Sequence, residues 1–380
     1  MKTDSPTVKV MQVITKGESG GAQTQVLALC QALAPRVRFV AVIGGPSPRS
    51  VLGDELQALG IAVCPLPQLG NSLSPLRVLA AVRALLRLLR AHRPAILHAH
   101  SAAAGVVARI AGRITNTPVI YTVHGFGFKP EAPLLQRLVA WLAESTLAPL
   151  TSHMICVSEH ERQLATRLPI APDRLTVITN AVADTPERAQ PDHQPMRIVM
   201  VARLARPKRP DLLLQALALL RDRLGREVPA SLIGDGPDLA AYRALTQQLG
   251  LKEVTFTGDV SDVSHRLAMH EVFILLSDHE GLPVSIIEAM RSGLAIVASD
   301  LPGTRELLTH GTDGLLVSND PDSLVDALQS LAATPDLRVS LGKAARQRYE
   351  DRFTPAPMAR AVGTLYGQII HHESARDLAR

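Results

Sequence analysis

Two glutamates separated by a short turn form the most specific chemical pattern in the sequence. Glu280 and Glu288 lie in the segment Asp278–Met290, which follows an apolar, strand-like run at 272–275. A carboxylate that accepts hydrogen bonds from two adjacent hydroxyls is the usual way to hold a ribose, and Glu288 is placed on a helix to do this. Glu280, in the turn, would then meet a sugar, and the backbone amides that open the helix at 281–284 favour an anion.

Either glutamate alone would fit an ordinary helix cap or an exposed helix acid, so the pattern needs a partner. A cationic loop provides one, because Arg203, Arg206, Lys208 and Arg209 directly follow an apolar run at 198–201. Arg203 and Lys208 are suited to neutralising a diphosphate. The alternative is a solvated basic loop before a helix. The position of the cationic loop after a strand end favours the ligand-binding interpretation.

A glycine-rich turn follows the first strand-like run, Val8–Ile14. Gly17, Gly20 and Gly21 precede a helical pattern, and free amides at a helix N-terminus suit a phosphate. The spacing differs from Gly-x-Gly-x-x-Gly, and no acidic residue closes a second strand, so a nicotinamide dinucleotide site is not favoured. A tight turn between strand and helix without a ligand is the alternative.

Three histidines and an Asp-Pro-Asp sequence are candidates for metal sites. His98, His100 and His124 follow or end strand-like runs, but no carboxylate lies near them in the sequence, which favours hydrogen-bonding roles over a metal cluster. Asp320-Pro321-Asp322 resembles an Asp-x-Asp metal motif but stands where a helix begins, so we expect a cap. We therefore expect no metal ion and no cofactor.

The elements that must position these residues alternate between short β-branched runs and longer helical patterns, which is typical of βαβ units. This rhythm predicts an α/β protein with two doubly wound parallel sheets, in a first domain at 1–187 and a second at 193–354. A stretch rich in Pro, Asp and Gln from Asp184 to Pro195 is interpreted as the linker. We expect the C-terminal segment 355–380 to be helical and to pack back on the first domain. Ligands of such sheets bind beyond the carboxyl ends of the strands.

Charge is distributed unevenly along the chain. Residues 1–190 carry 19 Lys and Arg against 11 Asp and Glu, and no acidic residue occurs from Leu56 to Pro130. Arg83, Arg87 and Arg90 share one face of a predicted helix at 74–93. A solvated helix face is one interpretation. The long acid-free stretch favours contact with anionic lipid.

Composition excludes several classes of protein. Aromatic residues make up only 3% of the 380 residues, which argues against a nucleic-acid binder that stacks bases on aromatic side chains. The three cysteines, Cys30, Cys64 and Cys156, are widely spaced and fit a reducing cytosol. No apolar leader precedes residue 8, and no run is long enough for a membrane span. We therefore expect a cytoplasmic protein, peripheral at the inner face of the membrane.

Taken in order, the motifs resemble glycosyltransferase family 4, whose members are retaining enzymes with the two-domain GT-B fold, including bacterial enzymes of cell-surface polysaccharide synthesis. The resemblance is carried by the glutamate pair and by further landmarks in sequence order: Gly20-Gly21, His98-Ala99-His100-Ser101, Thr122-Val123-His124-Gly125-Phe126, Val157-Ser158, Asn180-Ala181-Val182, Arg203 with Lys208, Gly234-Asp235-Gly236-Pro237 and Phe256-Thr257-Gly258. It covers nearly the whole chain and implies a cleft between the domains. Arg209 and Ala181 depart from the usual pattern, which has glycine at both positions.

The resemblance implies a role for each candidate residue. Arg203 and Lys208 would bind the donor diphosphate with the amides of Gly20 and Gly21 nearby, and Glu288 would hold the ribose. Val260 would contact the base through its backbone. The transferred sugar would be gripped by Glu280 with the backbone at Gly281, Leu282 and Pro283. His124 would be the active-site histidine.

The predicted function is transfer of a sugar, with retention, from a nucleotide diphosphate donor to a lipid-linked or polysaccharide acceptor, and the donor we expect is a UDP-sugar. Catalysis would rest on positioning and on stabilising the departing diphosphate, whose own oxygen would assist the incoming hydroxyl. A UDP-sugar 2-epimerase of the same fold is an alternative, but it would need carboxylates that the first domain lacks between 56 and 130. A two-lobed sugar-binding protein is a second alternative, which the single Trp disfavours.

Overall fold

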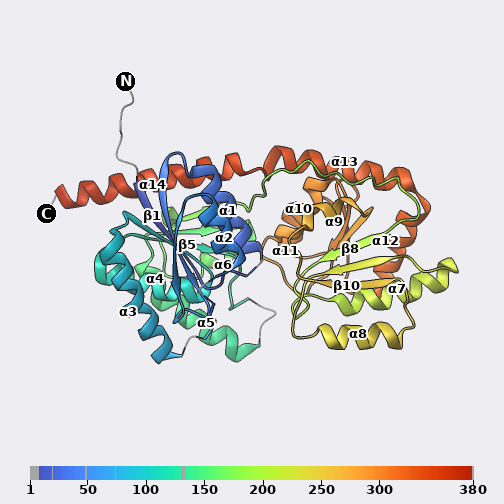
Figure 1. Cartoon of the computed structure of the whole chain (residues 1–380), viewed down its shortest axis with the longest axis horizontal. Helices are drawn as coiled ribbons and strands as arrows, with labels where there is room; N and C mark the ends of the chain where they lie inside the picture. Colours follow the sequence, from blue (N-terminus) through green and yellow to red (C-terminus); the bar gives the residue numbers. More distant parts are fainter. Residues whose placement is uncertain (1–7, 19, 48, 73, 130–132, 379–380) are drawn as a thin grey trace, which may run out of the picture. The chain divides into compact units, whose positions relative to one another are not determined.

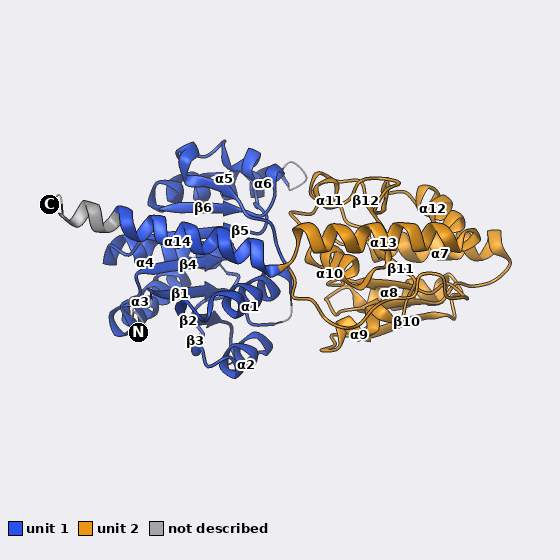
Figure 2. Ribbon diagram, turned by 90° about the horizontal axis from the view of Figure 1, so that it is seen from above, with its two compact units in different colours: residues 1–181, 355–380 blue, residues 182–354 orange. Residues whose placement is uncertain are grey.

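The structure, a computed structural model, describes residues 8–18, 20–47, 49–72, 74–129 and 133–378. It divides into two compact units, which are described separately (Figures 1 and 2). Unit 1 comprises residues 1–181 and 355–380, and unit 2 comprises residues 182–354. Residues 1–7, 379 and 380, which the predicted bounds include, lie outside the described part of the chain.

Unit 1 is built on a seven-stranded parallel sheet in the order β3-β2-β1-β4-β5-β6-β7. The strands are β1 (Val8–Ile14), β2 (Val37–Gly44), β3 (Ala62–Leu66), β4 (Ile96–His100), β5 (Val119–Val123), β6 (His153–Cys156) and β7 (Leu175–Val177). Strand β4 pairs with both β1 and β5, so Ile14, His100 and Thr122 lie side by side in the register. The carboxyl ends of β1, β4 and β5 therefore meet at one edge of the sheet.

Helices cover both faces of this sheet, since successive side chains of a buried strand point to opposite faces. They are α1 (Gly21–Leu33), α2 (Val51–Ala58), α3 (Pro75–His92), α4 (Ala102–Thr115), α5 (Leu134–Leu147), α6 (Glu159–Ala165) and α14 (Pro355–Leu378), with short 3₁₀ turns at Ala148–Leu150 and Pro172–Arg174. One core joins the sheet to α1, α2 and α14, and the other joins it to α3, α4 and α6. The C-terminal helix α14 packs on α1 and buries Met358, Val362 and Tyr366.

Unit 2 is a six-stranded parallel sheet in the order β10-β9-β8-β11-β12-β13. Its strands are β8 (Ile198–Val201), β9 (Ala230–Ile233), β10 (Val254–Gly258), β11 (Val272–Leu275), β12 (Ala295–Ser299) and β13 (Leu315–Val317). Its helices are α7 (Pro210–Leu224), α8 (Leu239–Gln248), α9 (Val263–Ala268), α10 (Val284–Ser292), α11 (Pro302–Leu307), α12 (Pro321–Ala333) and α13 (Pro335–Arg352). Strand order reverses between β8 and β11, where ligands of such sheets bind. Both sheets confirm the predicted doubly wound α/β class.

The stretch interpreted as a linker instead packs within unit 2. The Ala189 amide donates to the Ser292 carbonyl at 2.8 Å, and the fully buried Arg338 donates from Nε to the Pro191 carbonyl at 2.6 Å. Asp184 forms an ion pair with Arg346 at 2.8 Å, which holds the pKa of Asp184 at about 2. The chain therefore passes from unit 1 to unit 2 at residues 181 and 182, because these long-range contacts order the Pro-rich segment.

No helix among the described residues is long and apolar enough to cross a membrane.

Candidate active site

The cationic loop and the glutamate turn of unit 2 meet at the carboxyl edge of β8 and β11. Two backbone bonds join the loops, from the Arg209 amide to the Leu276 carbonyl at 2.9 Å and from the Asp278 amide to the Pro207 carbonyl at 2.8 Å. This places the Lys208 ammonium on Glu280 Oε1 in a mostly buried ion pair. The sequence predicted both residues for the site, and the structure adds that they contact each other.

The other cations of this loop differ in what they bind. Arg206 and Arg209 both form ion pairs with Asp278, and Arg209 also pairs with Asp211 at 2.7 Å. These carboxylates raise the pKa of Arg209. Arg203 is exposed, and its guanidinium has no hydrogen bond or ion pair to any described residue. Arg203 is therefore the cation that remains free for an anionic ligand.

Glu288 lies on α10, and the described residues leave its carboxylate without a hydrogen-bond partner. The side chain is half-buried and has no hydrogen bond or ion pair to any residue that the structure describes. Burial raises its pKa, and the charge of Arg291 opposes that effect in part. A half-buried carboxylate without a partner is costly unless a ligand supplies the missing hydrogen bonds.

The turn before α10 is held by close backbone packing. A Cβ on Gly303, in the first turn of α11, would lie 2.3 Å from the Gly281 carbonyl oxygen and 2.6 Å from that of Glu280, so only glycine fits. Pro283 occupies the N-cap position of α10 and has no amide hydrogen, so the expectation that every amide of 281–284 donates is wrong at Pro283. Gly281, Leu282 and Val284 retain amide hydrogens.

Glycines also shape the neighbouring loops of unit 2. Gly234 has φ of 127°, and a Cβ on it would lie 2.1 Å from the Ala202 carbonyl oxygen. A Cβ on Gly236 would similarly lie 2.2 Å from the Leu204 carbonyl oxygen. These close approaches fix the backbone on either side of Arg203. Val260, half-buried, follows the carboxyl end of β10 at the edge of the same sheet.

The remaining predicted residues belong to unit 1. Gly20 is the N-cap of α1, with no side-chain cap and no acidic residue in the first turn, and both Gly20 and Gly21 are exposed. The open amides of this turn suit an anion. His124 follows the carboxyl end of β5 and is half-buried.

A buried polar network fixes the protonation of His124. Gln12 donates from Nε2 to the Tyr366 hydroxyl at 3.1 Å, which leaves its amide oxygen 2.9 Å from His100 Nε2. Since that oxygen only accepts, His100 Nε2 carries the proton and its Nδ1 accepts. His124 Nε2, 3.3 Å from His100 Nδ1, must therefore donate. The lone pair of His124 Nδ1 is then available to a substrate hydroxyl.

The remaining member of the network, His98, is bonded on both nitrogens. Its Nδ1 lies 2.7 Å from the Tyr366 hydroxyl, and its Nε2 lies 2.7 Å from Thr122 Oγ1. Among the described residues, no group of three or more His, Cys, Asp or Glu side chains is placed to hold a metal ion. Asp320 caps α12 by accepting from the Ser323 amide at 2.8 Å, with Pro321 in the first turn.

The buried histidines make a prediction about pH and stability. Burial lowers the pKa of His98 to about 3 and that of His124 to about 4, and burial together with both neighbouring imidazoles lowers the pKa of His100. The unfolded chain, with histidine pKa values of about 6.5, binds more protons between about pH 6.5 and 4. The free energy of unfolding should therefore decrease as the pH is lowered through this window, by up to about 1.4 kcal/mol per pH unit for each histidine.

The check is thermal unfolding of the wild type and of His98→Gln at pH 7 and pH 5. The midpoint should drop toward pH 5 in the wild type, and the drop should be smaller in the variant. A wild-type midpoint that is the same at both pH values would contradict the assignment.

Sequence reasoning missed Gln12 and Tyr366. Gln12 interrupts the buried apolar strand β1, and an isolated polar residue in such a strand is the signal that would have found it. Tyr366 lies on α14, more than 350 residues from Gln12, and no local pattern marks their contact.

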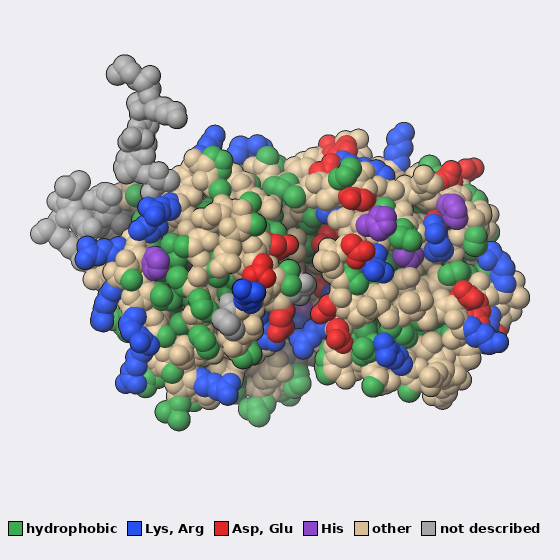
Figure 3. Space-filling model, in the orientation of Figure 1, with side chains coloured by type: hydrophobic (Ala, Val, Ile, Leu, Met, Phe, Trp, Pro, Cys, Tyr) green, Lys and Arg blue, Asp and Glu red, His purple; other side chains and the backbone are tan. Residues whose placement is uncertain are grey.

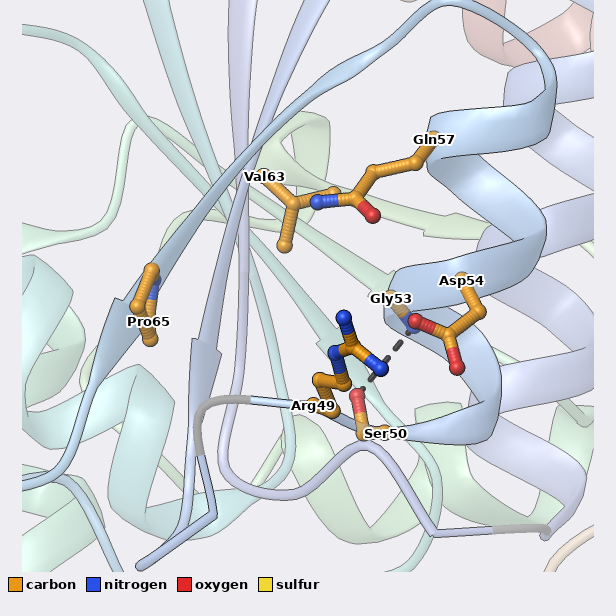
Figure 4. Close-up of a pocket in the computed structure, with 7 residues that line it drawn as sticks. All are labelled: Arg49, Ser50, Gly53, Asp54, Gln57, Val63 and Pro65. Carbon is orange, nitrogen blue, oxygen red and sulfur yellow. Dashed lines mark hydrogen bonds between the residues drawn. The ribbon is translucent and has the colours of Figure 1, made fainter.

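A separate hollow of about 390 Å³ lies between α2 and β3 in unit 1 (Figure 4). It is lined by Arg49, Ser50, Gly53, Asp54, Gln57, Val63 and Pro65. The Ser50 hydroxyl accepts from the Gly53 amide at 3.2 Å and caps α2. None of the predicted site residues lines this hollow.

Solved structures of known proteins share this fold. The Anabaena protein HepE in complex with UDP-glucose superposes with a TM-score of 0.80 at 21% identity, over 95% of this chain and 99% of that chain. Sucrose-phosphate synthase from Thermosynechococcus elongatus gives a TM-score of 0.82 at 20% identity, over 96% and 100%. These likenesses show that the chain has the GT-B fold.

Sequence comparison narrows this class to a family. Residues 20–181 match the glycosyl transferase 4-like domain, and residues 183–348 match the glycosyl transferases group 1. The chain belongs to glycosyltransferase family 4. The Escherichia coli UDP-Gal:α-D-GlcNAc-diphosphoundecaprenol α-1,3-galactosyltransferase is 27% identical over 83% of this chain and 84% of its own. The Mycobacterium tuberculosis phosphatidyl-myo-inositol mannosyltransferase is 27% identical over 92% of this chain and 94% of its own.

Proposed function

We propose that the protein transfers a sugar, with retention, from a UDP-sugar to a lipid-linked or polysaccharide acceptor in the synthesis of a cell-surface glycan. The observation that carries the proposal is the carboxylate of Glu288, which the described residues leave unpartnered on the helix that follows the Lys208–Glu280 pair at the carboxyl edge of unit 2. The comparisons support it, since one structural neighbour holds UDP-glucose and two relatives are named for lipid-linked acceptors.

In this proposal, donor recognition rests mainly on unit 2. Glu288 accepts from the two ribose hydroxyls, and Val260 contacts the base through its backbone. Arg203 and Lys208 neutralise the diphosphate, and the exposed amides at Gly20 and Gly21 of unit 1 add to that stabilisation. Because Lys208 is already paired with Glu280, a bound donor would place the ammonium between a carboxylate and a phosphate.

The transferred sugar would be oriented by hydrogen bonds rather than by a covalent bond to the protein. Glu280 and the backbone at Gly281 and Leu282 would hold its hydroxyls, and His124 Nδ1 would accept from one of them. The departing diphosphate oxygen would take the proton of the incoming acceptor hydroxyl as the sugar bond to that oxygen breaks. Catalysis would then come from positioning and charge stabilisation.

We further propose that cations of the protein and helix N-termini offset the donor charge without a divalent ion. Calorimetric titration with UDP, GDP and ADP is expected to select UDP, with the same affinity in EDTA and in Mg²⁺. Selection of another nucleotide would overturn the choice of donor. A strict requirement for Mg²⁺ or Mn²⁺ would show that a metal ion completes the site.

A lipid-linked acceptor has to be met at a bilayer surface. We propose that the enzyme works in the cytoplasm at the inner face of the membrane, attracted by the exposed arginines Arg83, Arg87 and Arg90 of α3. Cations near an anionic leaflet each contribute roughly 1 kcal/mol, and added salt weakens the attraction.

A further inference from the structure

One helix of unit 1 turns its apolar side chains outward. On α5, Leu134 is 78% exposed and Leu135 is 75% exposed, whereas a leucine-rich helix normally buries its apolar stripe. We call the exposed set the α5 apolar face. It consists of Leu134, Leu135, Leu138, Val139, Trp141 and Leu142.

An internal ion pair holds α5 in this orientation. Glu144 of α5 accepts from Arg109 Nη1 of α4 at 2.8 Å, and the Arg109 side chain is fully buried. Arg109 is itself fixed, since its Nε donates to the Gly105 carbonyl at 2.9 Å and its guanidinium lies 4.5 Å from the centre of the Tyr121 ring. At 100° per residue, Glu144 lies on the side of the helix opposite Leu135 and Leu142. Rotating the leucines inward would break a buried ion pair, which is strongly unfavourable.

The neighbouring surface of the same helix layer is cationic. Helix α3 packs on α4, and α4 contacts α5, so the three helices form one layer over the sheet. Along α3 the spacing places Leu76, Leu79, Arg83, Arg87 and Arg90 in one exposed stripe. None of these arginines has an ion pair among the described residues. Figure 3 shows hydrophobic and basic side chains along the edge of unit 1 that carries α3 and α5.

We propose that the α5 apolar face inserts into a membrane leaflet that contains anionic lipid, while the α3 arginines bind its headgroups. Apolar side chains beside unpaired cations are the pattern of a helix that lies in the membrane interface. A second copy of the chain fits less well, because a symmetric contact would bring two sets of arginines together without acids to pair them. The inference rests on the proposed function in one respect, since a lipid-linked acceptor supplies the reason for docking.

The single tryptophan of the chain, Trp141, lies in this face and reports directly on insertion. Its fluorescence is measured with vesicles of neutral phosphatidylcholine and with vesicles that also contain phosphatidylglycerol. The emission should shift to the blue with the anionic vesicles only, and lipids brominated along their chains should quench it. Sedimentation with anionic vesicles without any change in emission would overturn insertion.

Paired variants separate the two parts of the surface. Leu134→Gln with Leu138→Gln should abolish the shift and weaken vesicle binding by about tenfold or more, because leucine burial is lost. Replacing Arg83, Arg87 and Arg90 by serine should weaken binding on the order of 100-fold. The matched controls are Leu59→Gln with Leu219→Gln, two exposed leucines outside this surface, and Arg36→Ser with Arg38→Ser. Equal losses in the controls would overturn the assignment of this surface.

Two further measurements complete the test. Sedimentation velocity without lipid should show that the wild type is not a dimer held together by the α5 apolar face. A wild-type dimer that is lost in the Leu134→Gln, Leu138→Gln double variant would instead identify this face as a contact between copies of the chain. UDP affinity, measured by calorimetry, should be unchanged in all these variants. If the protein inserts into vesicles but does not bind UDP, the proposed donor is wrong and the proposed membrane-binding surface stands. If it binds UDP but does not insert, the membrane-binding surface is wrong and the proposed donor stands.

Discussion

Replacing His124 by alanine is expected to lower turnover of the UDP-sugar by about 100-fold to 1,000-fold, the range measured when one positioned hydrogen-bonding group is removed from an active site. The reason is the lone pair that the network through Gln12 and His100 leaves on His124 Nδ1. UDP affinity should stay within about twofold, since the proposed contact is to the sugar.

Glu280→Ala should also lower turnover without weakening UDP binding, but for a different reason. Removing its carboxylate loses a contact to the sugar and also releases Lys208 from its ion pair, so UDP binding should be unchanged or tighter while turnover falls. Turnover is measured with the donor that nucleotide titration selects, and UDP affinity is measured by calorimetry. His371→Ala, an exposed histidine on α14, is the control and should behave as wild type. Near wild-type turnover in either site variant would show that its assigned role is wrong.

Replacing Glu288 by glutamine is expected to weaken UDP binding by about 1 to 3 kcal/mol, the scale of a lost charged hydrogen bond. Lys208→Ala should weaken it by a similar amount through the diphosphate. Burial raises the pKa of Glu288, and ribose hydroxyls bind the ionised carboxylate, so wild-type UDP affinity should also fall as pH is lowered. Glu288→Gln should flatten that dependence on pH.

Calorimetry with UDP at pH 8 and pH 5.5 tests both parts of this expectation. Glu253→Gln and Lys343→Ala, exposed residues of the same unit, are matched controls for the loss of charge. Unchanged UDP affinity in both Glu288→Gln and Lys208→Ala would remove the donor site from this edge of the sheet.

Several strands of this protein could be predicted closely from the sequence because they are short apolar runs rich in β-branched residues. The predicted runs at 8–14, 198–201 and 272–275 coincide with β1, β8 and β11. Strand β7 was missed because Leu175–Val177 is only three residues long and the neighbouring residues show no alternation. The segment after Asp184 was misinterpreted because its order depends on Arg338 and Arg346, which are distant in the sequence.

The candidate site could be predicted as residue types but not as contacts. Parallel strands bring their carboxyl ends to one edge, so the proximity of the loops at Lys208 and Glu280 follows from topology. Their ion pair depends on the register in which the two loops bond, and this is not visible in the sequence. The outward leucines of α5 are not visible in the sequence either, because the buried Arg109–Glu144 pair on the inner side of α5 joins residues that are 35 positions apart.

The path of the chain also determines the order in which the units can be completed during synthesis. Unit 2 is continuous in sequence and has its residues once Thr354 has been made, whereas unit 1 begins first but lacks α14 until the end. Tyr366, which bonds Gln12 and His98, is therefore added after every other part of the network. A nascent chain that has left the ribosome only as far as Thr354 would hold a complete unit 2 and, on α1, the apolar surface that α14 later covers. The histidine geometry is therefore the last part of the site that translation completes.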